Sequence, residues 1–268
     1  MKTAFAPVAL AALTALLWPV AALAQDSPSV DEIVKKTNHQ AYYQGQDGRA
    51  RVHMTITDAQ GRTRERKFTI LRKDVEDDID GIQKFFVYFH EPADVRDMVY
   101  MVWKNVGKDD DRWLYLPELD VTKRIAASDE RTSFVGSHFF YEDVSGRGLD
   151  EDEHELVETT DTYYVIKNTP KDASKVEFDS FTMWIHKATF IPVKVEFEKG
   201  GNVYRTAEVK AVKDIQGYKT VTKSTMTDTN IGGETTVEYG DVQYDIGVSE
   251  DVFTERYLRT PPREFLGN

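Results

Sequence analysis

The ordered part of the chain begins with the hydrophobic spacing of a helix. Apolar or small side chains recur every three or four residues, at Val30, Ile33, Val34, Thr37 and Ala41. This spacing places them on one face of an amphipathic helix. The preceding residues 29–32, SVDE, have the S-x-x-E form of a capping box. We therefore expect a helix that begins after Ser29 and ends near Gly45.

From residue 50 onward the period of the pattern is two, as in strands with one buried face. Alternation or short apolar runs predict strands at 50–57, 63–73, 82–89, 97–105, 112–117, 121–126, 153–158, 162–168, 175–187, 191–198, 203–213, 218–228 and 234–244. The connections are short and rich in glycine, which leaves no room for crossover helices. We therefore expect a mainly β protein, an antiparallel meander that forms a single domain over residues 25–268.

Two of the predicted strands are apolar on both faces. In IQKFFVYFH, residues 82–90, aromatic and aliphatic side chains occupy successive positions, and DMVYMVW, residues 97–103, has the same character. Both faces of such a strand have to be covered. A helix, a partner or a bound apolar ligand could cover the second face.

The first 24 residues have the three parts of a secretory signal peptide. Lys2 gives a basic start, an apolar run follows, and the small residues Ala22 and Ala24 close it. We expect cleavage after Ala24 and a periplasmic location for the rest of the chain. An uncleaved membrane anchor is the alternative, which Pro19 inside the run disfavours.

The charge of the chain limits the partners that it can bind, and its cysteine content limits how it can be stabilised. The chain has 46 Asp and Glu against 34 Lys and Arg, a formal net charge of −12, and no cysteine. This balance argues against binding nucleic acid or an anionic membrane surface through bulk charge. A chain of this length can bury a stable core without disulfides.

Two acidic runs, Asp109–Asp111 and residues 76–81, invite comparison with metal sites. A calcium loop needs carboxylates at alternate positions, glycine at the sixth and glutamate at the twelfth. The triplet lacks this spacing, while the other run opens with Glu76 and has Val87 at its twelfth position. We expect no metal and no cofactor, and we interpret both runs as solvated turns.

Signatures of catalysis are equally weak. The six histidines are His39, His53, His90, His138, His154 and His186, and none forms H-x-x-x-H or H-E-x-x-H. Ser137 beside His138 lacks the G-x-S-x-G spacing and fits a loop that enters a short helix. We expect the protein not to be an enzyme; a lipid hydrolase that uses this pair is the least favoured alternative.

Aromatic residues are frequent on the predicted strands. They are Trp103, Trp113, Tyr115, Trp184, Phe197 and Tyr204, with Phe139, Phe140 and Tyr141 in the short segment 131–144. Each one alone fits an ordinary core. Together they predict a curved sheet with an apolar concave face, partly covered by helices and able to take an acyl chain.

Several separated blocks of sequence resemble the outer-membrane lipoprotein-sorting protein family, the LolA/LolB-like group. They are GKDDDRWLYLPELDVTKRIAASDERTSFVGSHFFYEDV (107–144), FIPVKVEFEKGGNVYRTAEV (190–209), GYKTVTKSTMTD (217–228) and YDIGVSEDVFTERYL (244–258). One departure is His138, where the family usually carries Asp after Gly-Ser. If that acid caps the short helix, we expect here a looser helix start or a different polar contact.

The resemblance implies a half-open antiparallel β-barrel of about eleven strands, with an N-terminal helix and short lid helices over an apolar cavity. It implies binding and transport of lipids or lipoproteins through the periplasm towards the outer membrane, with the acyl chain in the cavity. The implied partners are these acyl chains, an inner-membrane permease and an outer-membrane acceptor. The alternative is a lipid-sensing or accessory subunit that docks on a permease of the resistance–nodulation–division type.

We expect the lid to be the segment Asp129–Asp143. The residues expected to line the cavity are Met54, Ile56, Phe68, Phe86, Tyr88, Tyr100, Trp113, Tyr115, Phe139, Trp184 and Phe197. A slip of one residue in a strand would move its side chains to the opposite face. If the assignment holds, changing both Trp113 and Phe86 to Asp abolishes lipid uptake while the sheet still folds.

Overall fold

The computed structural model describes Met1 and residues 27–76 and 80–267. The predicted signal peptide after Met1, and residues 77–79 of the second acidic run, lie outside the described residues. Among the residues described, no helix has the length and apolar character that a membrane crossing requires.

Thirteen antiparallel strands form one sheet, so the mainly β prediction is confirmed. The strands are β1 (Asp47–Asp58), β2 (Thr63–Asp74), β3 (Gln83–Glu91), β4 (Val99–Lys104), β5 (Asp111–Leu116), β6 (Val121–Ile125), β7 (Asp152–Thr159), β8 (Tyr163–Pro170), β9 (Ser180–His186), β10 (Pro192–Lys199), β11 (Asn202–Ile215), β12 (Tyr218–Asp228) and β13 (Gly233–Tyr244). Each of the thirteen predicted segments forms a strand. The sheet therefore has two strands more than the eleven or so that the resemblance implied.

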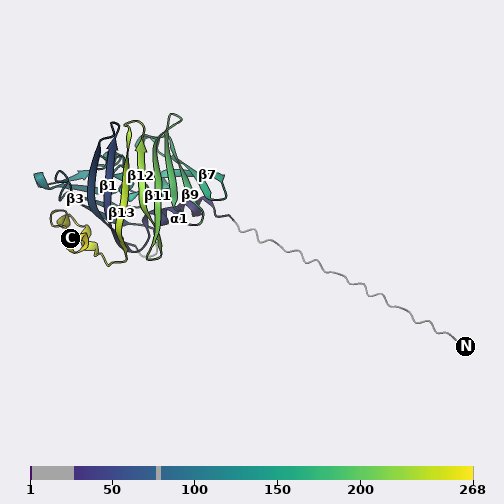
Figure 1. Ribbon diagram of the computed structural model, residues 1–268, viewed down its shortest axis with the longest axis horizontal. Helices are drawn as coiled ribbons and strands as arrows, with labels where there is room; N and C mark the ends of the chain where they lie inside the picture. The colour runs from purple at the N-terminus through teal and green to yellow at the C-terminus, as the bar shows by residue number, and fades with distance from the viewer. Residues whose placement is uncertain (2–26, 77–79, 268) are drawn as a thin grey trace.

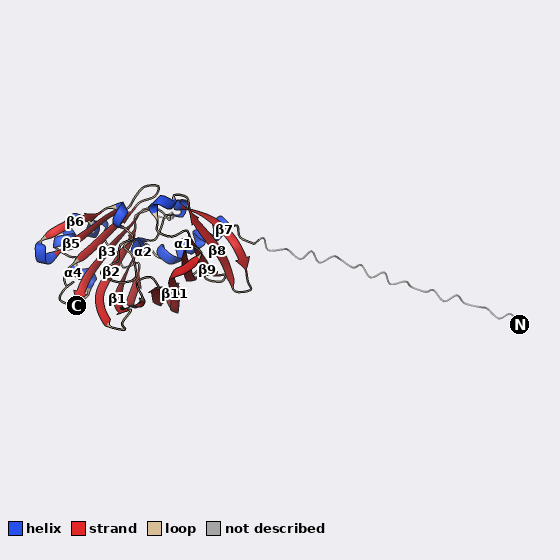
Figure 2. Ribbon diagram, turned by 90° about the horizontal axis from the view of Figure 1, so that it is seen from above, coloured by secondary structure: helices blue, strands red, loops and turns tan. Residues whose placement is uncertain are grey.

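The sheet consists of a first meander, β1–β6, and a second meander, β7–β13, which meet where β1 pairs with β13. Its order is β6-β5-β4-β3-β2-β1-β13-β12-β11-β10-β9-β8-β7. Met54 of β1 lies opposite Val237 of β13 at this junction. The edges β6 and β7 do not pair, so the barrel stays open, and Figure 2 shows the resulting arc.

The two edge strands are consecutive along the chain, so the residues between them have to pass across the concave side of the arc. We call residues 126–151 the bridging segment. It contains the short helices η2 (Ala127–Asp129), α2 (Glu142–Ser145) and η3 (Leu149–Glu151), and it includes the expected lid, Asp129–Asp143. Figure 2 shows α1 and α2 inside the arc.

Helix α1 (Val30–Tyr42) forms as its capping box predicts. The backbone N–H of Glu32 donates to the Ser29 hydroxyl, and the backbone N–H of Ser29 donates to the Glu32 carboxylate. The apolar face of the helix packs Ile33 and Val34 against Ile166 and Ile185 of the sheet. The helix thereby occupies the concave side of the second meander (Figure 1).

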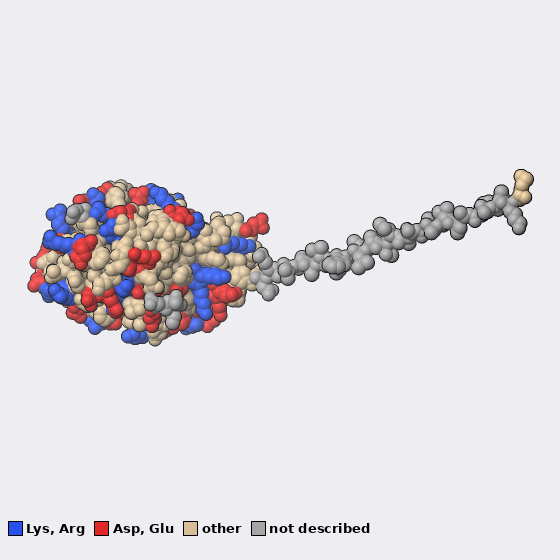
Figure 3. Space-filling model, turned by 90° about the horizontal axis from the view of Figure 1, so that it is seen from below, with Lys and Arg blue, Asp and Glu red and all other residues tan. Residues whose placement is uncertain are grey.

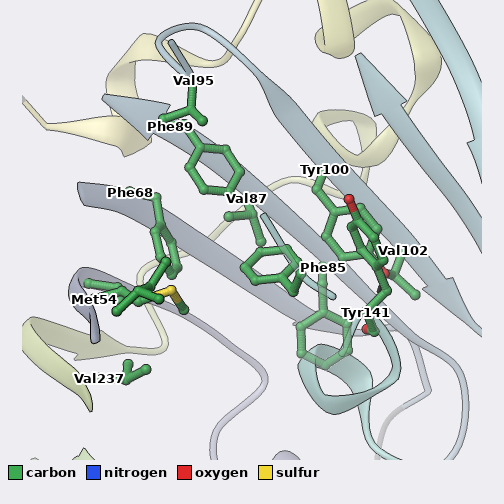
Figure 4. Packing of buried hydrophobic residues seen from close by; sticks show 13 residues of the cluster. Met54, Phe68, Phe85, Val87, Phe89, Val95, Tyr100, Val102, Tyr141 and Val237 are labelled. Atoms are coloured by element: carbon green, nitrogen blue, oxygen red, sulfur yellow. Dashed lines mark hydrogen bonds between the residues drawn. The ribbon is translucent and has the colours of Figure 1, made fainter. Parts of the chain in front are cut away.

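The concave face of the first meander is largely filled. The inward side chains of β1 to β4 form a core with Phe134 and Tyr141 of the bridging segment. Figure 4 shows this cluster, in which Phe68, Phe89 and Tyr100 pack in a continuous layer. The bridging segment is therefore part of the core on this side.

The C-terminal residues cover the convex face of the same strands. After β13 the chain forms η5 (Glu250–Phe253), α3 (Glu255–Arg259) and α4 (Arg263–Leu266); η1 (Pro117–Leu119) and η4 (Ala173–Lys175) lie in other connections. Phe253 and Leu258 pack with Phe86 and Met101 in a second core. The second face of the doubly apolar strands is thus covered by the chain's own helices.

Candidate ligand-binding cavity

The concave side of the sheet is hollow across the junction of β1 with β13 and over much of the second meander. Inward side chains of β9 to β11 remain only half-buried, among them Met183, Val195, Phe197, Ala207 and Val209. The corresponding side chains of β3 and β4 are fully buried because the bridging segment packs directly on them. Unfilled space therefore remains between the sheet, α1 and the bridging segment.

The larger part of this space, the large cavity, has a volume of about 390 Å³. Its apolar wall comes mainly from β1, β2, β3 and β13, with Met54, Phe68, Ile70, Val87 and Val237. Phe139 and Val144 of the bridging segment also line it. The volume lies within the range of small-molecule sites, and the wall is of the kind that binds apolar ligands.

A second space, the small cavity, has a volume of about 240 Å³ and also borders α1. Its wall includes Val34 of α1 and Phe181, Met183, Ala207 and Met226 of the sheet. The two cavities share part of their walls, namely Ala41, Tyr42, Phe139, Asp143 and Pro192. They are therefore adjoining compartments of one hollow interior.

Buried ion pairs fix the bridging segment to the first meander. Arg112 of β5, with only 2% of its side chain exposed, donates to Glu130 of the bridging segment at 2.7 Å and to Asp110 at 2.9 Å. The Nζ of Lys104 donates to the carbonyl of Gly146 at 2.6 Å. Such pairs lie in a low dielectric, where loss of one partner leaves an uncompensated charge.

Asp110 corrects the interpretation of the acidic triplet as a solvated turn. Asp109 is exposed, but the Asp110 side chain is 9% exposed and pairs with Arg112. It also accepts a hydrogen bond from the Ser145 hydroxyl at 3.1 Å. Only spatial proximity to α2 reveals this anchoring role, because Ser145 lies 35 residues away in sequence.

Further ion pairs fix the bridging segment to the second meander. The guanidinium of Arg205 on β11, also 2% exposed, donates to the carboxylate of Asp143 and to the carbonyl of His138. Arg147 donates to Asp152, the first residue of β7, at 3.0 Å. Both halves of the sheet therefore hold the segment that closes the concave side.

One carboxyl group within this network is held towards its neutral form. Glu142 is buried, and burial raises its pKa to about 7, against the opposing effect of Arg147. Arg147 donates to Glu142 at 3.0 Å, and Arg131 lies 3.7 Å from it. The charge of the network therefore changes within the neutral pH range.

His138 forms the different polar contact that its departure from the family pattern suggested. Its Nδ1 lies 2.8 Å from the Thr235 hydroxyl and its Nε2 lies 3.1 Å from the Gly232 carbonyl. The Gly232 carbonyl can only accept, so Nε2 donates to it. Both ring nitrogens are occupied away from Ser137, so His138 does not serve as its base in this arrangement.

The structure places four of the predicted lining residues at the cavities. Met54 and Phe68 line the large cavity, Phe197 lines the small one, and Phe139 lines both. Ile56 and Tyr100 face the same side but are fully buried in the adjacent core. Whether these residues contact a ligand remains a prediction.

The other predicted lining residues lie on the convex face, which corrects their assignment to the cavity. Phe86, Tyr88, Trp113 and Tyr115 pack in the core under the C-terminal helices. Trp184 also faces outward, with the Nζ of Lys194 4.5 Å from its ring centroid. Phe86 and Tyr88 were assigned to the wrong face because hydrophobicity does not tell the two faces of a doubly apolar strand apart. For the other three, the strand parity was off by one residue.

The sequence reasoning missed two tyrosines of the cavity walls, Tyr42 and Tyr239. The sequence contained a signal for each of these two residues. Tyr42 closes the predicted helix, and Tyr239 alternates with Val237 in the predicted strand 234–244. Only the junction of β1 with β13 shows that this strand borders the cavity.

An open antiparallel sheet with a helix and a bridging segment across its hollow concave side defines the class, a LolA-like fold. A family model described only as an uncharacterized protein matches residues 81–260, and the chain belongs to that family.

Solved structures share this fold. A DUF1329 family protein from Desulfovibrio piger is 25% identical, with a TM-score of 0.77, over 87% of this chain and 100% of that one. An outer membrane lipoprotein-sorting protein domain from Vibrio parahaemolyticus is 26% identical, with a TM-score of 0.76, over 85% and 97%. A LolA superfamily protein from Nitrosomonas europaea is 19% identical, with a TM-score of 0.66, over 86% and 100%. The comparison with curated proteins found no match.

Proposed function

We propose that the protein binds acyl chains of lipids or lipoproteins in its hollow interior and carries them through the periplasm towards the outer membrane. The observation that carries this proposal is the large cavity, a space of about 390 Å³ walled mainly by apolar side chains. The similarity to a lipoprotein-sorting domain supports the same class of cargo. The expected signal peptide, residues 1–24, supports the location.

The physical basis of capture is transfer of the acyl chain out of water. Each buried methylene contributes about 0.8 kcal/mol, so partial burial of one chain is enough to hold it. Release requires the interior to open. The bridging segment is the element that would have to move, since it closes the concave side and is held by ion pairs at separate points.

The test is a matched pair of substitutions on one strand. Val209 of β11 lines the large cavity, whereas Val212 of the same strand is 41% exposed. We expect Val209→Asp to lower the affinity for a pyrene-labelled fatty acid at least tenfold, because a carboxylate in an apolar wall needs solvation. Val212→Asp should bind like the unchanged protein.

Circular dichroism establishes that both variants are folded. Equal binding by a folded Val209→Asp protein would refute the cavity assignment. Transfer of the bound probe to acceptor vesicles then separates the two functions considered. A carrier releases the probe, whereas an accessory subunit of a permease retains it.

A further inference from the structure

Two tyrosines are among the polar residues that line the cavities beside the apolar side chains. Tyr42, at the end of α1, lines both cavities, and Tyr239 of β13 lines the large one. Both side chains are half-buried. No other described residue hydrogen-bonds to either hydroxyl. Because both residues line a cavity, we infer that their hydroxyls are available to a ligand.

The chemistry of these hydroxyls is that of hydrogen-bond donors. Burial, followed by the charge of Asp143, raises the pKa of Tyr42, and the same causes raise the pKa of Tyr239 to about 12. Both groups therefore stay protonated in neutral solution. A protonated phenol donates readily to a carbonyl oxygen.

Asp143 disfavours a negative charge on the ligand group that these hydroxyls contact. Its carboxylate lines both cavities. One oxygen accepts from the backbone N–H of Phe140 at 2.7 Å and from Arg205, which already compensates the charge. A second anion next to Asp143 would be repelled by its carboxylate, because the partner of that carboxylate, Arg205, is already engaged. An uncharged acceptor such as an ester carbonyl fits the site better.

The division of the interior into two compartments limits the shapes of ligand that can fill it. A large and a small compartment, about 390 and 240 Å³, meet at the wall that contains Tyr42. A single straight chain fills one of them. Two chains joined at one end can fill both, with the joint at the shared wall.

We propose, resting on the function proposed above, that the ligand is a diacylglyceryl group, with one acyl chain in each cavity and its ester carbonyls at the hydroxyls of Tyr42 and Tyr239. The same group occurs in phospholipids and in lipoproteins that carry a diacylglyceryl cysteine. The charged part of either ligand then lies outside the shared wall.

Stoichiometry in native mass spectrometry is the first test. The unchanged protein should bind one dimyristoyl phosphatidylglycerol or two molecules of monomyristoylglycerol. Ala207 lines the small cavity, so Ala207→Phe should leave room for one monomyristoylglycerol and no diacyl lipid. Thr206 is the neighbouring residue on the opposite strand face, and Thr206→Phe should keep the unchanged stoichiometry.

Removing the hydroxyls tests the ester contacts. Tyr42→Phe and Tyr239→Phe should each weaken diacyl lipid binding about two- to tenfold, the effect of one hydrogen bond. Binding of hexadecane, which has no carbonyl, should not change. Since neither hydroxyl has a partner within the described protein, the melting temperature should stay the same. Equal loss for hexadecane would overturn the assignment of these donors.

The outcomes also separate this inference from the proposed function. One monoacyl ligand per unchanged protein, with no diacyl lipid bound, would overturn the inference and leave acyl-chain carriage standing. No binding of any acyl compound would overturn both. A diacylglyceryl-cysteine peptide is measured in parallel: retention of either diacyl compound supports the inference, and the tighter one identifies the source.

Discussion

Arg112 and Glu130 face each other at 2.7 Å across the join between the sheet and the segment that crosses its open side. Arg112 belongs to β5, and Glu130 lies five residues beyond the end of β6. The guanidinium is almost fully buried and also serves Asp110. The concave side of the first meander is therefore closed by charge pairing as well as by the apolar contacts of Phe134 and Tyr141.

Substitution of Arg112 should reveal the contribution of this closure. We expect Arg112→Met to lower the free energy of unfolding by about 3–5 kcal/mol, because Asp110 loses its ion-pair partner and Glu130 keeps only Arg131. Arg124 is the matched control, since it pairs with Asp111 on the same hairpin but is 65% exposed. Arg124→Met should cost less than about 1 kcal/mol in the same urea titration. Similar losses in both variants would contradict the burial argument.

Glu142 should make the free energy of unfolding fall as the pH rises, which is the opposite of the usual effect of a carboxylate. Its folded pKa of about 7 lies above the ordinary 4.5, so the folded protein holds the proton more tightly than the unfolded chain. The stabilisation is complete below pH 4.5 and is lost as the pH rises through about 7. Relative to Glu142→Gln, the unchanged protein should lose at most about 3 kcal/mol across this window.

The control for this titration is an exposed carboxylate with the opposite shift. A hydrogen bond from Lys67 lowers the pKa of Glu91, so its contribution is present above pH 4.5 and is lost at lower pH. Urea unfolding across pH 3–8 should give differences of opposite sign, with that of Glu142→Gln changing above pH 4.5 and that of Glu91→Gln changing below it. A flat difference for Glu142→Gln would show that the network compensates its charge fully.

His138 should matter for stability because it ties the bridging segment to the turn before β13. His138→Ala removes the ring contacts with Thr235 and Gly232 and leaves a buried hole. We expect a loss of about 2–4 kcal/mol in unfolding free energy. His53→Ala, at a histidine whose side chain is 40% exposed, should cost less than about 1 kcal/mol. Thermal unfolding followed by circular dichroism measures both variants. Indistinguishable melting temperatures for the two would show that the His138 contacts do not stabilise the fold.

Because Phe86 lies on the convex face, its substitution by Asp should cause a folding defect instead of a binding defect. Phe86 is fully buried under the C-terminal helices, so Phe86→Asp places a carboxylate in an apolar core. We expect a cost of about 5 kcal/mol or more and loss of the cooperative unfolding transition. The double change with Trp113→Asp, expected from the sequence to spare the fold, should unfold the protein as well. A folded Phe86→Asp protein with normal stability would disprove the placement.

The sequence by itself determined the local structure of this protein. The capping box at Ser29 and the alternation along each strand depend only on neighbouring residues, so the helix and all thirteen strands could be predicted. Short connections also fixed the antiparallel order within each meander. The expected lid, Asp129–Asp143, lies within the bridging segment, and its opening stays a prediction.

Only the tertiary structure decided which face of each strand is inside. Phe85 and Phe86 are chemically identical, yet one lines the large cavity and the other packs under the C-terminal helices. The pairing of β1 with β13 and the contacts of Arg112 and Arg205 join residues that lie far apart along the chain. Hydrophobic periodicity reports that a residue is buried, but the partner that buries it is set by the closure of the whole chain.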